Sequence, residues 1–445
     1  MTIKPIAVRA ARMLDVRAGV YRSDVVVVVQ GGRIESVGSN VPTDSVVVDL
    51  GQRTLLPGLI DVHTHVLLHS NRMRDVTPQD NLTYMILQEY PAHRVARAVR
   101  NLRIALMNGF TSIRDCGTEG AAYDDVGLRD AVNEGVIPGP RMQVAGPALS
   151  PTGSYPILHY RPDWTFPTGV GTCDGPDGCR KAVRQQASYG TNWMKVYATM
   201  GYGTGMTPDG YIDSPPNWTK EELQAIVDEA HARGLRVAAH ATTITGTQMA
   251  IDAGVESIEH AHAIRPEMAE RIAEKGIFIV PTLTTSLNTA AGLAGPVPPI
   301  WREIPDVQAR SLANCHQAGV KIAFGTDAGS GSIPWTQLNQ AVEFRRQVDL
   351  GLSPVEAIRS ATVVAAELLT MEGKAGLICE GAYADLIALS GDPLNDVTSL
   401  ETLDFVMKNG EVIRSPNPAD VPTTSHSGHA VLRGGAPNVN DHDDD

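Results

Sequence analysis

The sequence lacks the features that tie a protein to a membrane, to nucleic acid or to a disulfide framework. Its apolar runs fall short of the roughly 20 residues that a transmembrane helix requires. Acidic residues outnumber basic ones by 50 to 37, and the net charge of −13 argues against nucleic acid or an anionic membrane as the main partner. The five cysteines include no C-x-x-C pair, so free thiols are expected, with a Cys173–Cys179 bridge as the alternative.

The N-terminal stretch MTIKPIAVRAARMLDV also lacks the apolar core and cleavage site of a signal peptide. We therefore expect a cytoplasmic protein that acts on a small molecule and binds no nucleic acid and no membrane. With 445 residues, of which 42% are hydrophobic, the chain can bury a substantial core, and its length suits a single α/β barrel.

Both ends of the chain have the character of β structure. DVVVVVQGGRIESVG near the start and LDFVMKNGEVI near the other end each contain a strand, a glycine turn and a second strand. We expect residues 1–57 and 371–415 to pair as the two parts of one small β-sandwich domain. Residues 416–445 are polar and rich in proline and glycine, which predicts a tail.

The middle of the chain, residues 58–370, repeats a unit of amphipathic helix, glycine and short apolar strand. Each glycine falls where the end of a helix requires a left-handed residue. Thr219 with Glu222 predicts a capping box at the start of one such helix. Helices that alternate with short buried strands predict a parallel sheet, so five clear repeats, with room for three more, predict a TIM-like (β/α)₈ barrel.

In such a barrel the active site lies at the carboxyl ends of the strands. His63 and His65 are two residues apart, so on a strand both rings face the same side. Alone, Lys195 in NWMKVYA would be interpreted as a lysine that reaches solvent, and a single strand-end aspartate as a helix cap. Imidazole and carboxylate together bind zinc, manganese, iron or nickel. The polar residues at the predicted strand ends are His63, His65, Asp115, Lys195, His240, His260, Thr282 and Asp327.

The sequence resembles the amidohydrolase superfamily in five motifs: PGLIDVHTH, the lysine of WMKVYA, AAHA, SIEHA and FGTDAG. The resemblance covers the barrel and both flanking β segments. It is nearest to the branch of metal-dependent prolidases, imidazolonepropionase-like proteins and ochratoxin-degrading amidases. It implies two divalent metal ions, expected to be zinc, with His63, His65 and Asp327 at the more buried ion and His240 and His260 at the more exposed one.

By the same resemblance, CO₂ carboxylates Lys195, and the carbamate bridges both ions together with a hydroxide that attacks the substrate. The chemistry of the amine agrees, because a neutral amine has one lone pair and cannot join two cations, whereas a carbamate has two oxygens and a negative charge. Burial near cations disfavours the ammonium form, and a neutral amine can attack CO₂. Asp327 is expected to take the hydroxide proton and pass it to the leaving amine.

The predicted substrate contacts depart from this branch. Relatives have a Gly-Gly-His-Gly run where this chain has TGSYPILHY, so Tyr155 or His159 is expected to replace that histidine. Tyr197 and Tyr202 either donate to the oxyanion or simply pack, and His262 either contacts substrate or lies on the surface. The aromatic-rich residues 151–178 are expected to form a loop over the barrel mouth that sets substrate choice.

The resemblance implies a binuclear hydrolase of a carbon–nitrogen bond and a homo-oligomer. Its expected substrates are N-acyl amino acids, Xaa-Pro-type dipeptides or bulky amides. Xenobiotic carbamates, thiocarbamates or phenylureas are the alternative substrates. A non-enzymatic scaffold on an inactive barrel is the alternative of a different class.

Overall fold

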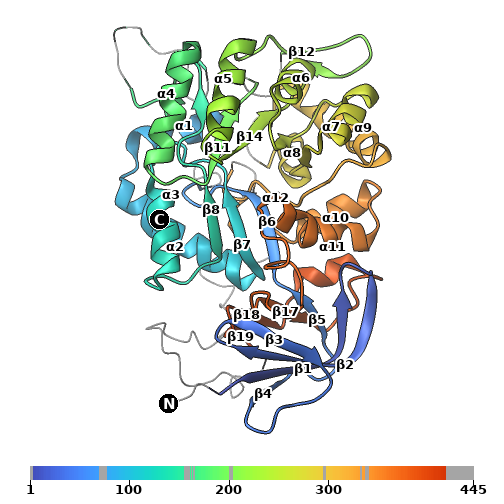
Figure 1. The fold of residues 1–445 in the computed structure, drawn as a ribbon. Coiled ribbons are helices and arrows are strands. Elements are labelled where there is room, and N and C mark those ends of the chain that lie inside the picture. Colours follow the sequence, from blue (N-terminus) through green and yellow to red (C-terminus); the bar gives the residue numbers. More distant parts are fainter. Residues whose placement is uncertain are drawn as a thin grey trace.

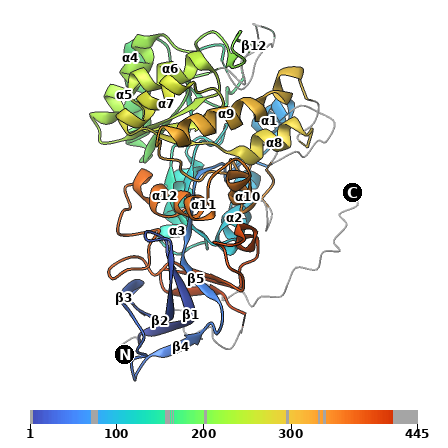
Figure 2. The ribbon, with the colours of Figure 1, turned by 90° about the vertical axis from the view of Figure 1, so that its right-hand side faces the viewer.

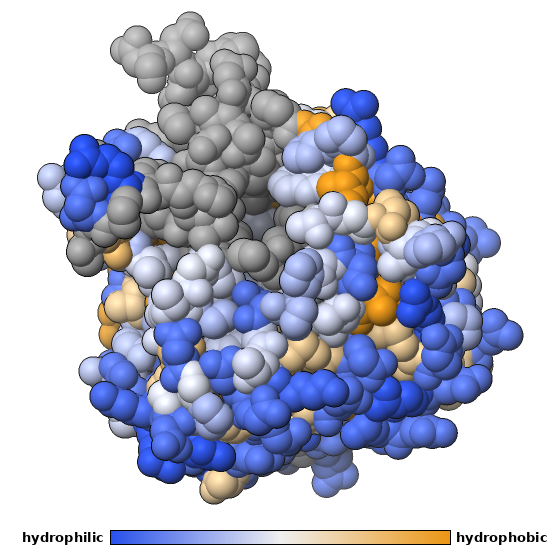
Figure 3. Space-filling model, turned by 90° about the horizontal axis from the view of Figure 1, so that it is seen from above, coloured by the Kyte–Doolittle hydropathy of each residue, from blue (hydrophilic) through white to orange (hydrophobic). Residues whose placement is uncertain are grey.

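The computed structural model describes residues 4–69, 78–154, 161, 163, 166–199, 204–293, 297–330, 333–335 and 340–416. Figures 1 and 2 show two parts, with strands from both chain ends in the lower part and helices around a set of strands in the upper part. The face seen in Figure 3 is mostly hydrophilic, and hydrophobic residues gather along one side of it.

One eight-stranded sheet joins the two ends of the chain in the lower part. Its strand order is β19-β18-β17-β5-β1-β2-β3, and β4 pairs with β1. Strand β5 joins the N-terminal strands of this sheet to the C-terminal ones, because it runs parallel to β1 and antiparallel to β17. The bounds are β1 Ile6–Asp15, β2 Val20–Gln30, β3 Arg33–Gly38, β4 Val46–Asp49, β5 Thr54–Pro57, β17 Leu386–Leu389, β18 Phe405–Lys408 and β19 Glu411–Arg414.

Parallel strands form the centre of the upper part. One sheet has the order β6-β7-β8 and another has the order β10-β9-β11-β14-β15-β16. A short antiparallel hairpin, β12 with β13, stands apart from them. The bounds are β6 Leu59–Thr64, β7 Phe110–Asp115, β8 Arg141–Val144, β9 Leu149–Ser150, β10 Gly171–Thr172, β11 Trp193–Tyr197, β12 Gly205–Met206, β13 Ile212–Asp213, β14 Arg236–Ala241, β15 Ser257–His260 and β16 Phe278–Val280.

Backbone hydrogen bonds connect these two parallel sheets at both edges. The N–H of Asn192, just before β11, donates to the C=O of Val144 at the end of β8, over 2.8 Å. At the other edge, the segment 322–328 forms parallel bridges to β16 and to β6. In the same segment, the C=O of Phe324 accepts from the N–H of Val62 over 2.9 Å.

Helices surround the parallel strands, which confirms the predicted α/β class. The capping box is present, since Glu222 N–H donates to Thr219 Oγ1 and Thr219 N–H donates to Glu222 Oε2. Gly254 and Gly276 end α6 and α7 in the left-handed conformation, as the repeats predict. The bounds are α1 Pro78–Gln88, α2 Pro91–Met107, α3 Asp124–Asn133, α4 Gly175–Ser188, α5 Lys220–His231, α6 Ile244–Ala253, α7 Pro266–Lys275, α8 Leu283–Ala290, η1 Pro299–Arg302, α9 Ile304–Gln317, α10 Val342–Asp349, α11 Pro354–Ser360, α12 Val363–Leu368 and η2 Val397–Glu401.

Strands β6, β7, β11 and β15 are buried along their whole length. Their polar residues therefore face an enclosed space rather than solvent. All five cysteines are free thiols, as expected, and no disulfide joins Cys173 to Cys179. Within the described ranges, no helix combines the length and the apolar character needed to cross a membrane.

Candidate metal centre

His63 and His65 at the end of β6 are each oriented through one ring nitrogen. His63 Nδ1 donates to Glu259 Oε2 over 2.6 Å, and His65 Nδ1 donates to the C=O of Gly117 over 2.8 Å. Because both acceptors lack a proton, Nδ1 carries the hydrogen in each ring, and Nε2 has a lone pair for another group whenever the ring is neutral. Both Nε2 atoms lie near Asp327 Oδ1, at 3.6 Å from His63 and 3.3 Å from His65.

Lys195 lies in the middle of β11 and points into this group rather than to solvent. Its side chain is buried, with only 1% of the residue exposed. Its Nζ is 3.4 Å from His63 Nε2. The amine is therefore within reach of the same space as the two histidines and Asp327.

His240 and His260 complete the group from the neighbouring strands β14 and β15. Their ring centroids are 4.6 Å apart, and the ring of His260 is 4.9 Å from that of His63. His260 Nδ1 lies 2.8 Å from Thr282 Oγ1, which orients this ring too. His260 and Asp327 have φ values of 69° and 60°, a left-handed backbone that costs free energy in residues other than glycine and is typical of functional sites.

The charges at this centre suit a cation. Burial raises the pKa of Asp327, but the hydrogen bond with His65 and nearby positive charges lower it more, to about 2, so this group is a carboxylate. Burial lowers the pKa of His63 to about 4, so its ring is neutral. For His65, burial lowers the pKa but Asp327 raises it more, to about 9. A divalent ion would compete with that proton for Nε2.

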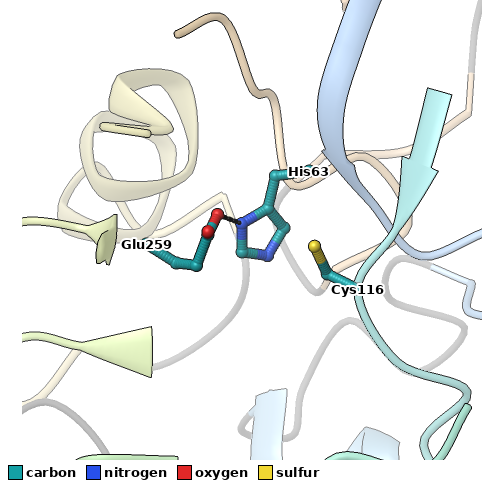
Figure 4. A group of neighbouring side chains, drawn as sticks. All are labelled: His63, Cys116 and Glu259. Atoms are coloured by element: carbon teal, nitrogen blue, oxygen red, sulfur yellow. Dashed lines mark hydrogen bonds and ion pairs between the residues drawn. The ribbon is translucent and has the colours of Figure 1, made fainter. Parts of the chain in front are cut away.

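Two groups of side chains share His63, and they differ in what they can bind. The candidate ligand atoms of His63, His65 and Asp327 all lie within 4.8 Å of one another, and so do those of His63, Cys116 and Glu259 (Figure 4). In the second group, His63 Nδ1 already donates to Glu259 Oε2, and Glu259 Oε1 accepts from Arg114, so these ligand atoms are occupied by one another and by Arg114. The group with Asp327 is therefore the better metal site.

Glu259 supports His63 instead of binding metal. Its Oε1 accepts from Arg114 over 2.8 Å and also from Ser257, while Oε2 accepts from His63. Burial raises the pKa of Glu259, but Arg114 and His63 lower it more, to below its usual range. The sequence did not lead us to predict the ion pair between Arg114 and Glu259. One signal was available, because Arg114 and Glu259 are opposite charges in strands that otherwise have buried character.

Two of the predicted substrate contacts are described, and both are buried. Tyr197 at the end of β11 donates its hydroxyl hydrogen to Glu119. His262 is 1% exposed and its Nε2 lies 3.0 Å from Ser286 Oγ, so the alternative that it lies on the surface is wrong. Burial lowers the pKa of His262 to about 3, which makes its ring neutral. The remaining predicted contacts, Tyr155, His159 and Tyr202, lie outside the described residues.

Comparison with known proteins agrees with this geometry. The chain matches the amidohydrolase family over residues 54–413. An ochratoxinase from Aspergillus niger is 31% identical over 388 residues, which cover 81% of this chain and 76% of the relative. An imidazolonepropionase from Deinococcus radiodurans is 27% identical over 419 residues, which cover 89% and 92%.

Solved structures show the same likeness in three dimensions. A Xaa-Pro dipeptidase with methionine bound in its active site has a TM-score of 0.80 at 29% identity, and the match covers 93% of this chain and 100% of that one. The shared fold is TIM-barrel-like. The chain therefore belongs to the amidohydrolase family and is a metal-dependent hydrolase of carbon–nitrogen bonds.

Proposed function

We propose that the chain hydrolyses the amide bond of a peptide-like small molecule, either a dipeptide or an N-acyl amino acid, including bulky amides. The observation that carries the proposal is the buried Lys195 amine, 3.4 Å from His63 Nε2 and in the same enclosed group as Asp327. Two divalent ions, expected to be zinc, would be held by His63, His65, Lys195, His240, His260 and Asp327.

The donor set fits two ions. The Nδ1 atoms of His63 and His65 donate elsewhere, which turns both Nε2 atoms toward the ions, an arrangement typical of metal-binding histidines. No carboxylate forms an ion pair with Lys195 among the described residues, and a buried unpaired ammonium costs free energy. Carboxylation would replace that cation with an anionic ligand that has two oxygens, which supports Lys195 as the bridge.

When bound, the two ions would polarise the substrate carbonyl and lower the pKa of a water molecule so that it attacks at neutral pH. Asp327 is suited to carry the proton that this water would lose. It is 4% exposed, and its low pKa makes it a carboxylate that can accept a proton from that water. It would deliver the proton to the nitrogen of the leaving amine, since an amine anion is a poor leaving group.

We also infer that eight strands close into one (β/α)₈ barrel. The eight are β6, β7, β8, β11, β14, β15, β16 and the segment 322–328. Hydrogen bonds or bridges join each of them to two neighbours, which supports closure. The β-sandwich with its domain boundaries, the cytoplasmic location and the homo-oligomeric state stay predictions from the sequence.

Metal analysis and a substrate panel test the function. The purified protein is expected to contain two metal ions per chain and to hydrolyse dipeptides or N-acyl amino acids with a higher kcat/KM than carbamates or phenylureas. Removal of the metal should abolish turnover, and zinc should restore it. Turnover confined to carbamates or phenylureas would replace the proposed substrate. A chain without metal and without turnover would be an inactive scaffold.

A further inference from the structure

A second buried carboxylate, Glu119, lies beside the metal centre and has a role in none of the steps above. It follows β7, is 2% exposed and has a φ of 46°, a strained value for a residue other than glycine. Its Oε1 accepts the hydroxyl hydrogen of Tyr197. Its Oε2 is buried and has no hydrogen-bond partner among the described residues.

The position of Glu119 is next to two of the proposed metal ligands. A Cβ atom at Gly117 would lie 3.5 Å from Glu119 Oε1 and 3.6 Å from His65 Cε1, so the carboxylate and the imidazole flank the same glycine. The ring of Tyr197, which holds Oε1, is 5.2 Å from the ring of His240. The carboxylate therefore lies close to His65, and its partner Tyr197 lies close to His240.

The buried guanidinium of Arg94, from α2, binds the backbone of this loop and not the Glu119 carboxylate. Arg94 is buried, and its two terminal nitrogens donate to the backbone C=O groups of Thr118 and Glu119, over 2.7 Å and 2.9 Å. These bonds fix the loop but leave the carboxylate without an ion pair in the part of the chain that the structure describes. Burying a carboxylate without a cation is costly, so such a group is typical of a site whose cation comes from a ligand.

We infer that Glu119 binds a free, protonated amino group on the acyl side of the substrate, with Tyr197 positioning the carboxylate. In an α-aminoacyl group the ammonium is one carbon from the scissile carbonyl, which matches a carboxylate beside the metal ligands. This inference rests on the proposed function and narrows it. The preferred substrates are dipeptides with an unmodified N-terminus, because an N-acyl group is larger and supplies no positive charge.

A pair of substrates with the same scissile bond tests the inference. For Leu-Phe and N-acetyl-Leu-Phe, wild-type enzyme is expected to show a kcat/KM ratio of roughly 30 or more in favour of the free amine, the effect of losing one partner of a buried charge pair. Glu119→Gln should bring this ratio close to one. Tyr197→Phe should lower it less, because the carboxylate stays but is no longer held.

Glu134→Gln is the matched control, since Glu134 is an exposed acid at the end of α3, and it should keep the wild-type ratio. Both site variants should retain two metal ions per chain. A ratio in Glu119→Gln equal to that of wild type would overturn the inference. So would loss of metal from Glu119→Gln, because Glu119 would then support His65 instead of the substrate. If Glu119→Gln fails to fold, Tyr197→Phe provides the test. A kcat/KM ratio in Tyr197→Phe equal to that of wild type would also contradict the inference.

A binding experiment without a scissile bond separates this inference from the proposed function. By calorimetry, wild-type enzyme should bind 1-amino-3-methylbutylphosphonate more tightly than 3-methylbutylphosphonate, and Glu119→Gln should lose that preference. If wild type hydrolyses neither dipeptide but keeps the preference, the proposed function is wrong and the amine site stands. If it hydrolyses both dipeptides equally and shows no preference, the proposed function stands and the amine site is wrong.

Discussion

Two buried glutamates lie beside the candidate metal centre, and their surroundings differ. Glu259 on β15 accepts hydrogen bonds from Arg114, Ser257 and His63, and its pKa lies below the usual range. Glu119 after β7 has a partner on one oxygen, and burial raises its pKa. A carboxylate with all its partners inside the protein has a structural role. One that lacks a cation is available to a ligand.

The largest effect is expected when the proposed bridging ligand of this centre, Lys195, is removed. Lys195→Ala should lower kcat by at least about 10³-fold and lose metal, because no bridging ligand remains. Activity assays and metal analysis measure the two effects. Short carboxylic acids should restore part of the activity by occupying the space of the carbamate. Wild-type turnover with two metal ions per chain would show that Lys195 is not the bridge.

Asp327→Asn should have the next largest effect. Asparagine keeps an oxygen that can bind metal but cannot carry the proton, and acid–base catalysis contributes roughly 10²–10⁴-fold. The fall should therefore appear in kcat, with KM little changed. Steady-state kinetics on a dipeptide would separate the two, and a rise in KM at constant kcat would instead assign Asp327 to substrate positioning.

Glu259→Gln tests the structural side of the comparison. The substitution leaves the buried Arg114 without its anion, which should lower the free energy of unfolding by about 3–5 kcal/mol. It should also weaken metal binding by roughly 10–100-fold, because His63 loses the acceptor that orients its ring. Denaturant unfolding and metal titration measure these losses. If neither changes, Glu259 is not the support for His63.

Glu119→Gln should have the smallest effect on stability. The hydrogen bond from Tyr197 can be kept by the amide oxygen, and no ion pair with a described residue is lost. The free energy of unfolding is expected to change by less than about 1 kcal/mol or to rise, since an uncompensated buried charge is removed. The same denaturant experiment compares the two glutamates directly. If Glu119→Gln lowers the free energy of unfolding as much as Glu259→Gln does, both glutamates have a structural role.

The sequence by itself predicted the α/β class, the glycine-ended helices and the capping box at Thr219, because these depend on local periodicity and on residues a few positions apart. It also placed His63 and His260 at or next to strand ends, where the structure has them, whereas Lys195 lies in the middle of β11 and not at its end. Parallel strands bring their carboxyl ends to one edge, so His63 and His260 were expected together before any coordinates.

Only the tertiary structure decided what surrounds each of these residues. Two of the three partners of Glu259 come from β6 and β7, and the partner of Glu119 comes from β11, across 78 positions of the chain. His262 likewise follows its strand as a plain polar residue, and the structure shows that it is buried, with Ser286 from α8 in contact with its ring. Whether a buried charge is compensated depends on side chains from distant elements that meet in three dimensions, and a pattern within one strand carries no information about them.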